Sequence, residues 1–345
     1  MLRRTVENLL GRMPVYLLRV AEWGDSVLRV VVYHRLLAPG QPFAGDPHLL
    51  SATVAEFDRQ IAYMRRHYTP VSAEQVVAVL RGEASLPRGA VLVTFDDAYR
   101  DVLIHASPVL QRYRVPALLF VPTAFPGTDR LFWWDEVYEA LRQTDRSQVR
   151  VVDHAFVLDT PAARHRAARA LIRLWRPLAP TALEDRRQAL LEQVGYPRID
   201  RAACAVLSWA EVAALATAGV AIGLHTRTHP ALPAVDPATL EAELETGDGD
   251  LRAHVPSGRV PCFAFPYGFV DARAVPVLRR LGYVAAFTTL AGVNRLGRRD
   301  PYRLCRYGVG IDHPRGRLPL NLTAAYAGLR ERTQTLRART RLALP

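Results

Sequence analysis

Short apolar runs alternate with segments of helical periodicity along most of this chain. Val54, Phe57, Ile61 and Met64 recur at the three- and four-residue spacing of one helix face. The apolar runs predict buried strands at residues 28–34, 91–97, 116–122, 220–225, 260–265 and 283–289, with a last strand near 303–311. Helices are expected between them, at residues 51–66, 71–80, 102–113, 209–218, 237–254 and 271–281. Because strands separated by helices pair in parallel, the pattern predicts an α/β fold of the barrel type.

The alternation is interrupted between residues 136 and about 207, where alanine, arginine and leucine dominate and helical patterns cover 162–175 and 183–194. We interpret this stretch as a helical insertion on one loop of a barrel that spans residues 28–318. A helical segment at 1–27 precedes the barrel, and residues 319–345 follow it as a C-terminal helix. An arginine-rich helical face is usually solvated surface, so its charge alone does not indicate a ligand site.

Charge and cysteine content narrow the functional classes only a little. The formal net charge is +12, from 45 basic and 33 acidic residues, and every basic residue is an arginine. Genome composition can produce that bias as easily as a nucleic-acid partner can, so we expect no nucleic-acid binding. Cys204, Cys262 and Cys305 form no CxxC pair, which argues against a disulfide framework and against a cysteine zinc site.

No membrane-spanning helix is expected, because the sequence contains no uncharged apolar run of about 18 residues. It shows neither an uninterrupted apolar segment nor a small-residue cleavage site near its start, so no signal peptide is expected. Residues 2–20 carry an apolar stripe interrupted by Pro14, which we interpret as a packing helix, with peripheral membrane contact as the alternative. The expected location is therefore the cytoplasm or the membrane face. The oligomeric state stays open.

The strand at 91–97 ends on two adjacent carboxylates, Asp96 and Asp97. Functional groups in α/β folds collect at the carboxyl ends of parallel strands, which places both acids at one rim of the sheet. Two like charges side by side are unfavourable unless one carboxylate is protonated or a cation lies beside them. The pair therefore predicts either a bound proton or a cation site.

Two histidines at the end of another predicted strand could supply the ligands for such a cation. His225 directly follows the apolar run at 220–224, and His229 comes four residues later. The spacing of the two histidines alone is weak evidence for a metal site. Their position at the end of a buried strand makes this evidence stronger. One carboxylate and two imidazoles form a facial triad that suits Zn, Fe, Co or Mn. Asp97, His225 and His229 would then bind the metal and leave Asp96 ionised as a base.

A third strand end carries Phe265-Pro266-Tyr267-Gly268, in which proline and glycine allow the backbone to approach a ligand closely. A backbone N–H in this turn could donate to an oxyanion. Three such motifs at strand ends are difficult to explain by core packing.

Taken in order, Thr94-Phe95-Asp96-Asp97, the segment from His225 to His229 and the segment from Phe265 to Gly268 resemble the first three motifs of the polysaccharide deacetylases of the NodB-homology type, family 4 of the carbohydrate esterases. The resemblance covers roughly residues 28–312. It implies a distorted (β/α)7 barrel and one divalent metal on Asp97, His225 and His229, with zinc preferred and cobalt, nickel, iron or manganese as alternatives. It further implies Asp96 as general base and the Tyr267 N–H in the oxyanion hole, with Pro266 beside the substrate.

The sequence departs from the family pattern at the residue that protonates the leaving group. The later motifs, an Asp before a Trp and a Leu-x-His near the C-terminus, are not recognisable, and the arginine of the third motif is absent. His34 at the end of the first strand resembles a branch that includes biofilm poly-N-acetylglucosamine deacetylases, and we favour it as general acid. His313 is the alternative.

Several aromatic residues are candidates for a substrate groove, because sugars stack on aromatic faces. These are Trp133, Trp134 and Trp209, together with the neighbouring Asp135. Core packing explains each tryptophan equally well.

The resulting expectation is a metal-dependent hydrolase that removes N-acetyl groups from N-acetylated sugars of a polysaccharide or glycan precursor. One alternative keeps the barrel and changes the bond, giving a hydrolase of other non-peptide C–N bonds. A second alternative is a catalytically inactive glycan-binding protein, which metal content would distinguish from the enzyme.

Overall fold

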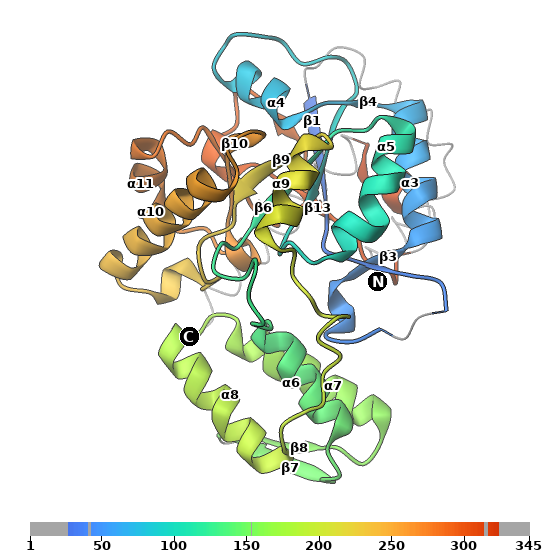
Figure 1. Cartoon of the computed structure of the whole chain (residues 1–345), viewed down its shortest axis with the longest axis vertical. Helices are drawn as coiled ribbons and strands as arrows, with labels where there is room; N and C mark the ends of the chain where they lie inside the picture. Colours follow the sequence, from blue (N-terminus) through green and yellow to red (C-terminus); the bar gives the residue numbers. More distant parts are fainter. Residues whose placement is uncertain (1–26, 41–42, 153, 314–316, 324–345) are drawn as a thin grey trace, which may run out of the picture.

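The computed structural model describes residues 27–40, 43–152, 154–313 and 317–323. Its main sheet alternates with helices as the apolar pattern predicts (Figure 1). The strands of this sheet are β1 (Val27–Tyr33), β4 (Thr69–Pro70), β5 (Ala90–Phe95), β6 (Ala117–Val121), β9 (Val220–Leu224), β10 (Arg259–Ala264), β11 (Ala285–Phe287), β12 (Asn294–Arg295) and β13 (Tyr307–Gly308). The helix expected at 1–27 and most of the C-terminal helix lie outside the described residues, which end with α12 (Arg317–Asn321) and two residues after it.

The sheet curls into a barrel. Six strands pair in parallel in the order β11-β10-β9-β6-β5-β1. Residues 304–309 join its two ends, because Leu304 N–H donates to Ala286 O in β11 and Val309 N–H donates to Val32 O in β1. The predicted (β/α)7 barrel is thus confirmed. The strand predicted at 303–311 is reduced to β13, because this segment crosses from β11 to β1 instead of running along either strand.

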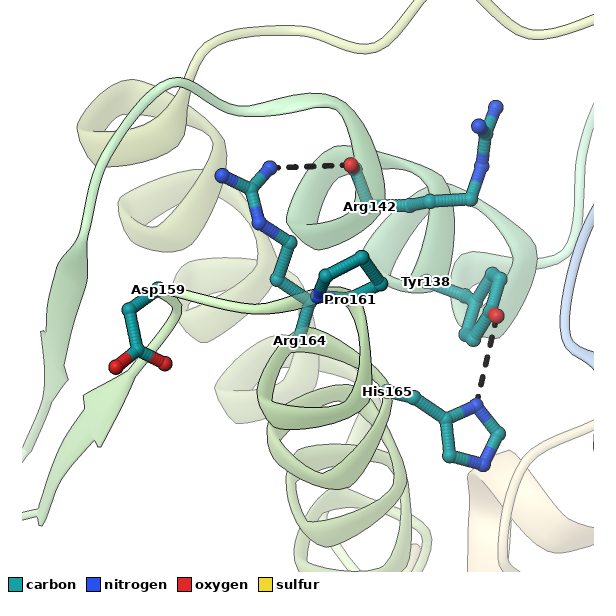
Figure 2. Close-up of a pocket in the computed structure, with 6 residues that line it drawn as sticks. All are labelled: Tyr138, Arg142, Asp159, Pro161, Arg164 and His165. Atoms are coloured by element: carbon teal, nitrogen blue, oxygen red, sulfur yellow. Dashed lines mark hydrogen bonds between the residues drawn. The ribbon is translucent and has the colours of Figure 1, made fainter.

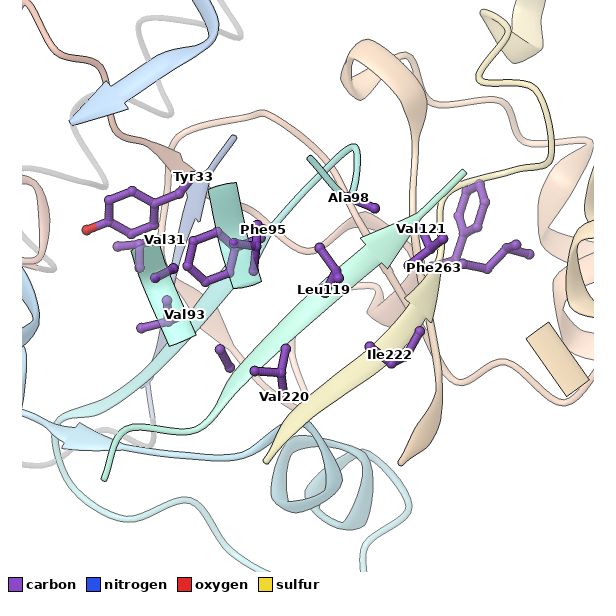
Figure 3. Close-up of a cluster of buried hydrophobic side chains, with 14 of the residues drawn as sticks. Val31, Tyr33, Val93, Phe95, Ala98, Leu119, Val121, Val220, Ile222 and Phe263 are labelled. Atoms are coloured by element: carbon purple, nitrogen blue, oxygen red, sulfur yellow. The ribbon is translucent and has the colours of Figure 1, made fainter. Parts of the chain in front are cut away.

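Alternate residues of each barrel strand face opposite sides, and both sides are apolar. Val31, Val93, Leu119 and Ile222 belong to the cluster on the outer face (Figure 3). The intervening residues line the interior, among them Val30, Leu92, Leu118, Phe120, Cys262 and Leu304. Strands buried on both faces read as continuous apolar runs, which explains why the sequence pattern identifies them.

Helices cover the outer face of the barrel. They are α3 (Val54–His67), α5 (Ser107–Tyr113), α9 (Trp209–Thr217), α10 (Pro237–His254) and α11 (Ala274–Arg280). A π-helical turn at Val102–Ala106 leads into α5. The helix α4 (Ala73–Leu80) packs Val76 and Val77 into the interior cluster beside Leu28 and Ala90, at the starts of the strands. Among the described residues, no helix is both long enough and apolar enough to cross a membrane.

The interruption in the pattern forms a separate lobe at the end of the molecule opposite α4 (Figure 1). We call residues 133–207 the insertion. It contains α6 (Trp133–Gln143), the antiparallel strands β7 (Gln148–Val151) and β8 (His154–Val157), α7 (Pro161–Trp175) and α8 (Pro180–Val194). Its helices share an apolar cluster that includes Val137, Leu171, Trp175 and Leu190. The hairpin was not predicted, although β7 alternates buried valines with exposed polar residues in the period of a strand.

Candidate functional site

Three loops after β5, β9 and β10 carry the three sequence motifs, and their backbones share an unusual conformation. Of the seven non-glycine residues with positive φ in the described part of the chain, five belong to these loops: Asp97, Ala98, Thr226, His229 and Tyr267. Such conformations cost about 1–3 kcal/mol each and persist where the surrounding structure holds them, most often at functional sites. The carboxyl end of the barrel is therefore the candidate site.

The predicted metal ligands converge at this end. The Nε2 atoms of His229 and His225 lie 3.3 Å and 3.6 Å from Asp97 Oδ1. One potential ligand atom from each residue lies within 4.8 Å of the others, and all three side chains are buried. Within the described chain, no other group of three His, Cys, Asp or Glu residues meets this condition. The three residues therefore share one site, and their role as metal ligands stays a prediction.

The donor set fits a divalent cation. His225 Nδ1 lies 2.7 Å from Ala264 O, so Nδ1 carries the proton and the Nε2 lone pair faces Asp97. Burial lowers the pKa of His225 to about 4, which favours the neutral, ligating imidazole. Burial alone would raise the pKa of Asp97, but the approach and charge of His229 hold it below its ordinary value. Asp97 Oδ1 is buried without a hydrogen-bond donor among the described residues, and a cation would satisfy this acceptor.

A glutamate on the neighbouring helix holds the histidine loop in place. Glu243 of α10 accepts hydrogen bonds from the N–H groups of Arg227 and Thr228, both at 2.8 Å, and from the Thr228 hydroxyl. Inside the loop, His229 N–H donates to Thr226 Oγ1 at 3.0 Å. Metal-binding side chains need this kind of support to keep a fixed orientation.

The second carboxylate has its own cation, which the sequence pattern did not reveal. Arg306, fully buried in the segment that closes the barrel, donates from both terminal nitrogens to Asp96 at 2.7 Å. Its Nε donates to Thr288 O at 3.0 Å. Burial alone would raise the pKa of Asp96, but the Arg306 guanidinium outweighs it and holds the pKa below its ordinary value. The adjacent acids are therefore kept ionised by two different partners. A lone arginine within the largely apolar segment 304–309 was the available signal.

The third motif forms a 3-10 turn at Pro266–Gly268, immediately after β10. Tyr267 adopts φ 56°, and its ring lies 4.6 Å from the His229 ring. Gly268 has φ 75°, and a Cβ there would overlap the side chain of Thr289, so the position requires glycine. The first N–H groups of a helical turn have no acceptor within it, which leaves the Tyr267 N–H suited to a ligand.

The structure places the two candidate acids differently. His34 follows β1, and its Nε2 lies 3.9 Å from Asp96 Oδ2, with 27% of the side chain exposed. The Nδ1 of His313 instead lies 3.1 Å from the Gly310 N–H and 3.1 Å from the Tyr307 hydroxyl. His34 thus joins the carboxylate pair, whereas these contacts of His313 lie within its own turn and the adjacent strand.

The four candidates for the substrate groove occupy distinct environments. Trp134 is buried with its ring 5.1 Å from that of His229, and its Nε1 donates to the Tyr99 hydroxyl. Asp135 is fully buried and accepts from Tyr99 Oη at 2.6 Å and from the backbone N–H of Asp46 at 2.8 Å. Burial raises its pKa to about 7. Asp135 is thus connected to His229 through Tyr99 and Trp134.

The other two tryptophans differ in their distance from the candidate site. Trp133 Nε1 donates to the Tyr267 hydroxyl at 3.1 Å, and Trp133 lines a cavity beside the metal ligands. Trp209 stacks on His254 at 4.3 Å, between α9 and α10, and is not among the described residues that line this cavity.

This cavity, which we call the rim cavity, lies between the barrel and the insertion and has a volume of about 450 Å³. His229, Pro230 and Tyr267 line it on the barrel side. Trp133 and Arg176 line it on the insertion side. The rim cavity therefore adjoins the candidate metal site directly.

The fold is an α/β barrel of the (β/α)7 type, and comparison with known proteins gives the family. A family model described as polysaccharide deacetylase matches residues 83–286. The chain belongs to the polysaccharide deacetylase family, as its motifs indicate.

The individual relatives match only a part of this chain. Poly-beta-1,6-N-acetyl-D-glucosamine N-deacetylase of Escherichia coli (strain K12) is 29% identical over 113 residues, which cover 32% of this chain and 15% of that protein. The corresponding protein of Escherichia coli O157:H7 is 30% identical over 103 residues, which cover 30% of this chain and 15% of that protein. The matched part thus spans about 15% of the length of these curated relatives.

Solved structures support the same fold. The structure of IcaB from Ammonifex degensii matches with a TM-score of 0.53 and 23% identity, over 88% of this chain and 97% of that chain. The Streptococcus pyogenes deacetylase PplD matches with a TM-score of 0.55 and 17% identity, over 87% of this chain and 99% of that chain. At these identities the matches show a shared architecture.

Proposed function

We propose that this chain is a metal-dependent N-deacetylase that acts on an N-acetylated sugar of a polysaccharide or glycan precursor. The observation that carries the proposal is the division of the acid pair. Asp97 faces two histidines with an unsatisfied oxygen, whereas Asp96 is held ionised by Arg306. Family membership and the local similarity to poly-beta-1,6-N-acetyl-D-glucosamine N-deacetylases support deacetylation as the reaction.

Asp97, His225 and His229 would hold the metal, for which zinc is our first choice. When bound, the metal would act as a Lewis acid toward the acetyl carbonyl and the attacking water. Asp96 lies next to these ligands and remains an ionised carboxylate, so it can accept a proton from that water. Its bidentate contact with Arg306 fixes the orientation of the carboxylate.

The remaining groups would act on the acetamide. The Tyr267 N–H, presented by a strained turn, would donate to the oxygen that becomes negative in the tetrahedral intermediate. His34 would protonate the leaving amine, because it lies beside Asp96 and is partly exposed toward solvent. The rings of Trp134 and Tyr267 pack around His229 and would exclude water from the ligand set.

Replacing Asp96 by asparagine tests the assignment. The variant keeps the shape of the side chain and cannot accept the proton, so acetate release should fall by about 10² to 10⁴ while metal content is retained. The substrates would be acetylated β-1,6-glucosamine oligomers, assayed with and without a chelator.

Asp97→Asn is the matched control, since it should lose both the metal and the activity. Circular dichroism would verify that both variants fold. Full activity in Asp96→Asn would exclude Asp96 as the base, and activity insensitive to the chelator would exclude metal dependence.

A further inference from the structure

The rim cavity contains more positive charge than its own carboxylates balance. Three arginines line it, Arg130, Arg176 and Arg187, against two glutamates, Glu136 and Glu184. Arg187 lies 2.8 Å from Glu136 and 2.5 Å from Glu184, so one arginine accounts for both acids. Arg130 and Arg176 are left without a carboxylate among the residues described around this cavity.

Of the three arginines that line the rim cavity, Arg176 is the one that lies against Tyr267 of the third motif. Its guanidinium lies over the Tyr267 ring, 5.9 Å from the ring centroid, and that ring contacts His229. A guanidinium has five N–H donors. Arg176 makes no hydrogen bond or ion pair with any described residue, and its Nε is buried without an acceptor. Unused buried donors are unfavourable unless a ligand completes them.

The N-terminus of α8 adds to the positive charge at the rim cavity. Its N-cap residue, Ala179, provides no side-chain hydrogen bond, and the first turn contains no acidic residue. Pro180 and Leu183, in the first two turns, line the rim cavity. An uncapped helix N-terminus carries a partial positive charge and favours anions, so it reinforces Arg176.

A second pocket, within the insertion, shows what a satisfied arginine looks like in this protein (Figure 2). There, Arg142 is paired with Glu139 at 2.6 Å, and Arg164 donates to the carbonyl oxygens of Leu158, Thr144 and Arg142. The guanidinium of Arg176 has no such partners in the described part of the chain. The difference singles out the rim cavity as the place for an external anion.

We propose that the rim cavity binds a phosphate or carboxylate group carried by the substrate, with Arg176 as its principal ligand. The inference rests on the proposed function, because the anionic group would be attached to the N-acetylated sugar at the metal site or to the neighbouring unit. The planar fork of arginine matches both oxyanions in a bidentate manner. The preferred substrate is therefore an anionic N-acetylated sugar.

The preference for an anionic substrate can be measured by comparing the binding of charged and neutral N-acetylated sugars. The full chain carrying Asp96→Asn, which should keep the acetyl group intact, would be titrated by calorimetry with N-acetylglucosamine 1-phosphate, N-acetylmuramic acid and methyl N-acetylglucosaminide. We expect at least one of the two anionic sugars to bind about tenfold more tightly than the neutral glycoside, or about 1.4 kcal/mol. The two anionic sugars distinguish a phosphate from a carboxylate ligand.

Variants test whether Arg176 causes the preference for anionic sugars. With Arg176→Gln added, the anionic and neutral sugars should bind about equally tightly. Arg176→Lys in its place should keep part of the preference for the anionic sugar. The matched control is Arg173→Gln, which removes an exposed arginine from the last turn of the same helix and should leave the preference unchanged.

Equal binding of the three sugars, no detectable binding at millimolar concentration, or a preference that survives Arg176→Gln would overturn the inference. Acetate release by the wild-type chain is measured separately. An anion preference without acetate release would contradict the proposed function and leave the anion site standing.

Discussion

The carboxyl end of the barrel and the insertion both pair arginines with carboxylates, but the two regions differ in how much water reaches the pairs. Arg306 and Asp96 are 0% and 3% exposed, whereas Arg187, Glu136 and Glu184 are 17%, 26% and 60% exposed. A buried pair is held by the lack of any alternative partner, and an exposed pair competes with water. The barrel pair is thus suited to fixing the orientation of Asp96, which we propose as the base, whereas the insertion pairs are open to solvent.

The neighbourhood of each arginine supports the same distinction. Around Arg306, strand backbone and the Phe120 ring pack closely, and all three nitrogens have acceptors. Around Arg176, a cavity opens and the donors stay unused by the described residues. Saturation of the donors, and not the residue type, therefore separates structural arginines from candidate ligand-binding arginines.

The largest expected effect comes from removing the buried arginine. Arg306→Gln leaves the Asp96 charge buried without its partner, so the free energy of unfolding should fall by about 3–5 kcal/mol and acetate release should be lost. Urea unfolding of the variant and the wild type measures the difference. A loss below about 1 kcal/mol would show that the pair behaves like a surface pair and would remove the contrast between the regions.

A smaller effect is expected from the turn that carries Tyr267. Gly268→Ala and Gly282→Ala both place alanine at positive φ, 75° and 84°, but only the first Cβ meets a neighbour, Thr289. Overpacking typically costs about 1–3 kcal/mol, so Gly268→Ala should be less stable than Gly282→Ala by that amount. It should also lose activity, because the turn shifts. Thermal unfolding and acetate assays of the two variants would decide, and equal behaviour would contradict the steric argument.

The smallest effect is expected in the insertion. Arg187→Gln removes the partner of Glu136 and Glu184 at a place that water can reach, so the free energy of unfolding should change by about 0.2–1 kcal/mol. The same urea titration measures it. A loss comparable to that of Arg306→Gln would mean that the insertion depends on its ion pairs as strongly as the barrel does.

Much of the barrel could be predicted because its strands are buried on both faces. Such strands appear in the sequence as continuous apolar runs, which are easy to recognise at β1, β5, β6, β9 and β10. The hairpin of β7 and β8 is short, half-exposed and embedded in helices, so its alternation is a weak signal. The closing segment 304–309 is largely apolar and was predicted as part of a longer strand, but it joins two strands instead of running along one, so only β13 forms.

The same difference applies to the site. Asp96, Asp97 and His225 stand directly after strands, and His229 follows in the same loop as His225, so the apolar pattern places all four at one rim. His34 and Tyr267 follow the same rule. The prediction of Asp135 as a groove residue rested on its tryptophan neighbours, but its carboxylate is fully buried and accepts hydrogen bonds from Tyr99 and from the Asp46 N–H.

The sequence by itself determined the six parallel strands of the barrel, the family motifs and the need for a positive charge, either a proton or a cation, beside two adjacent carboxylates. Only the tertiary structure decided how that charge is supplied, because Arg306 lies 210 positions from Asp96 and meets it through closure of the barrel. It also decided that Arg176 of the insertion faces the ring of Tyr267 without a partner among the described residues. Local periodicity fixes which face a residue presents, whereas contacts between distant segments depend on how the whole sheet curls.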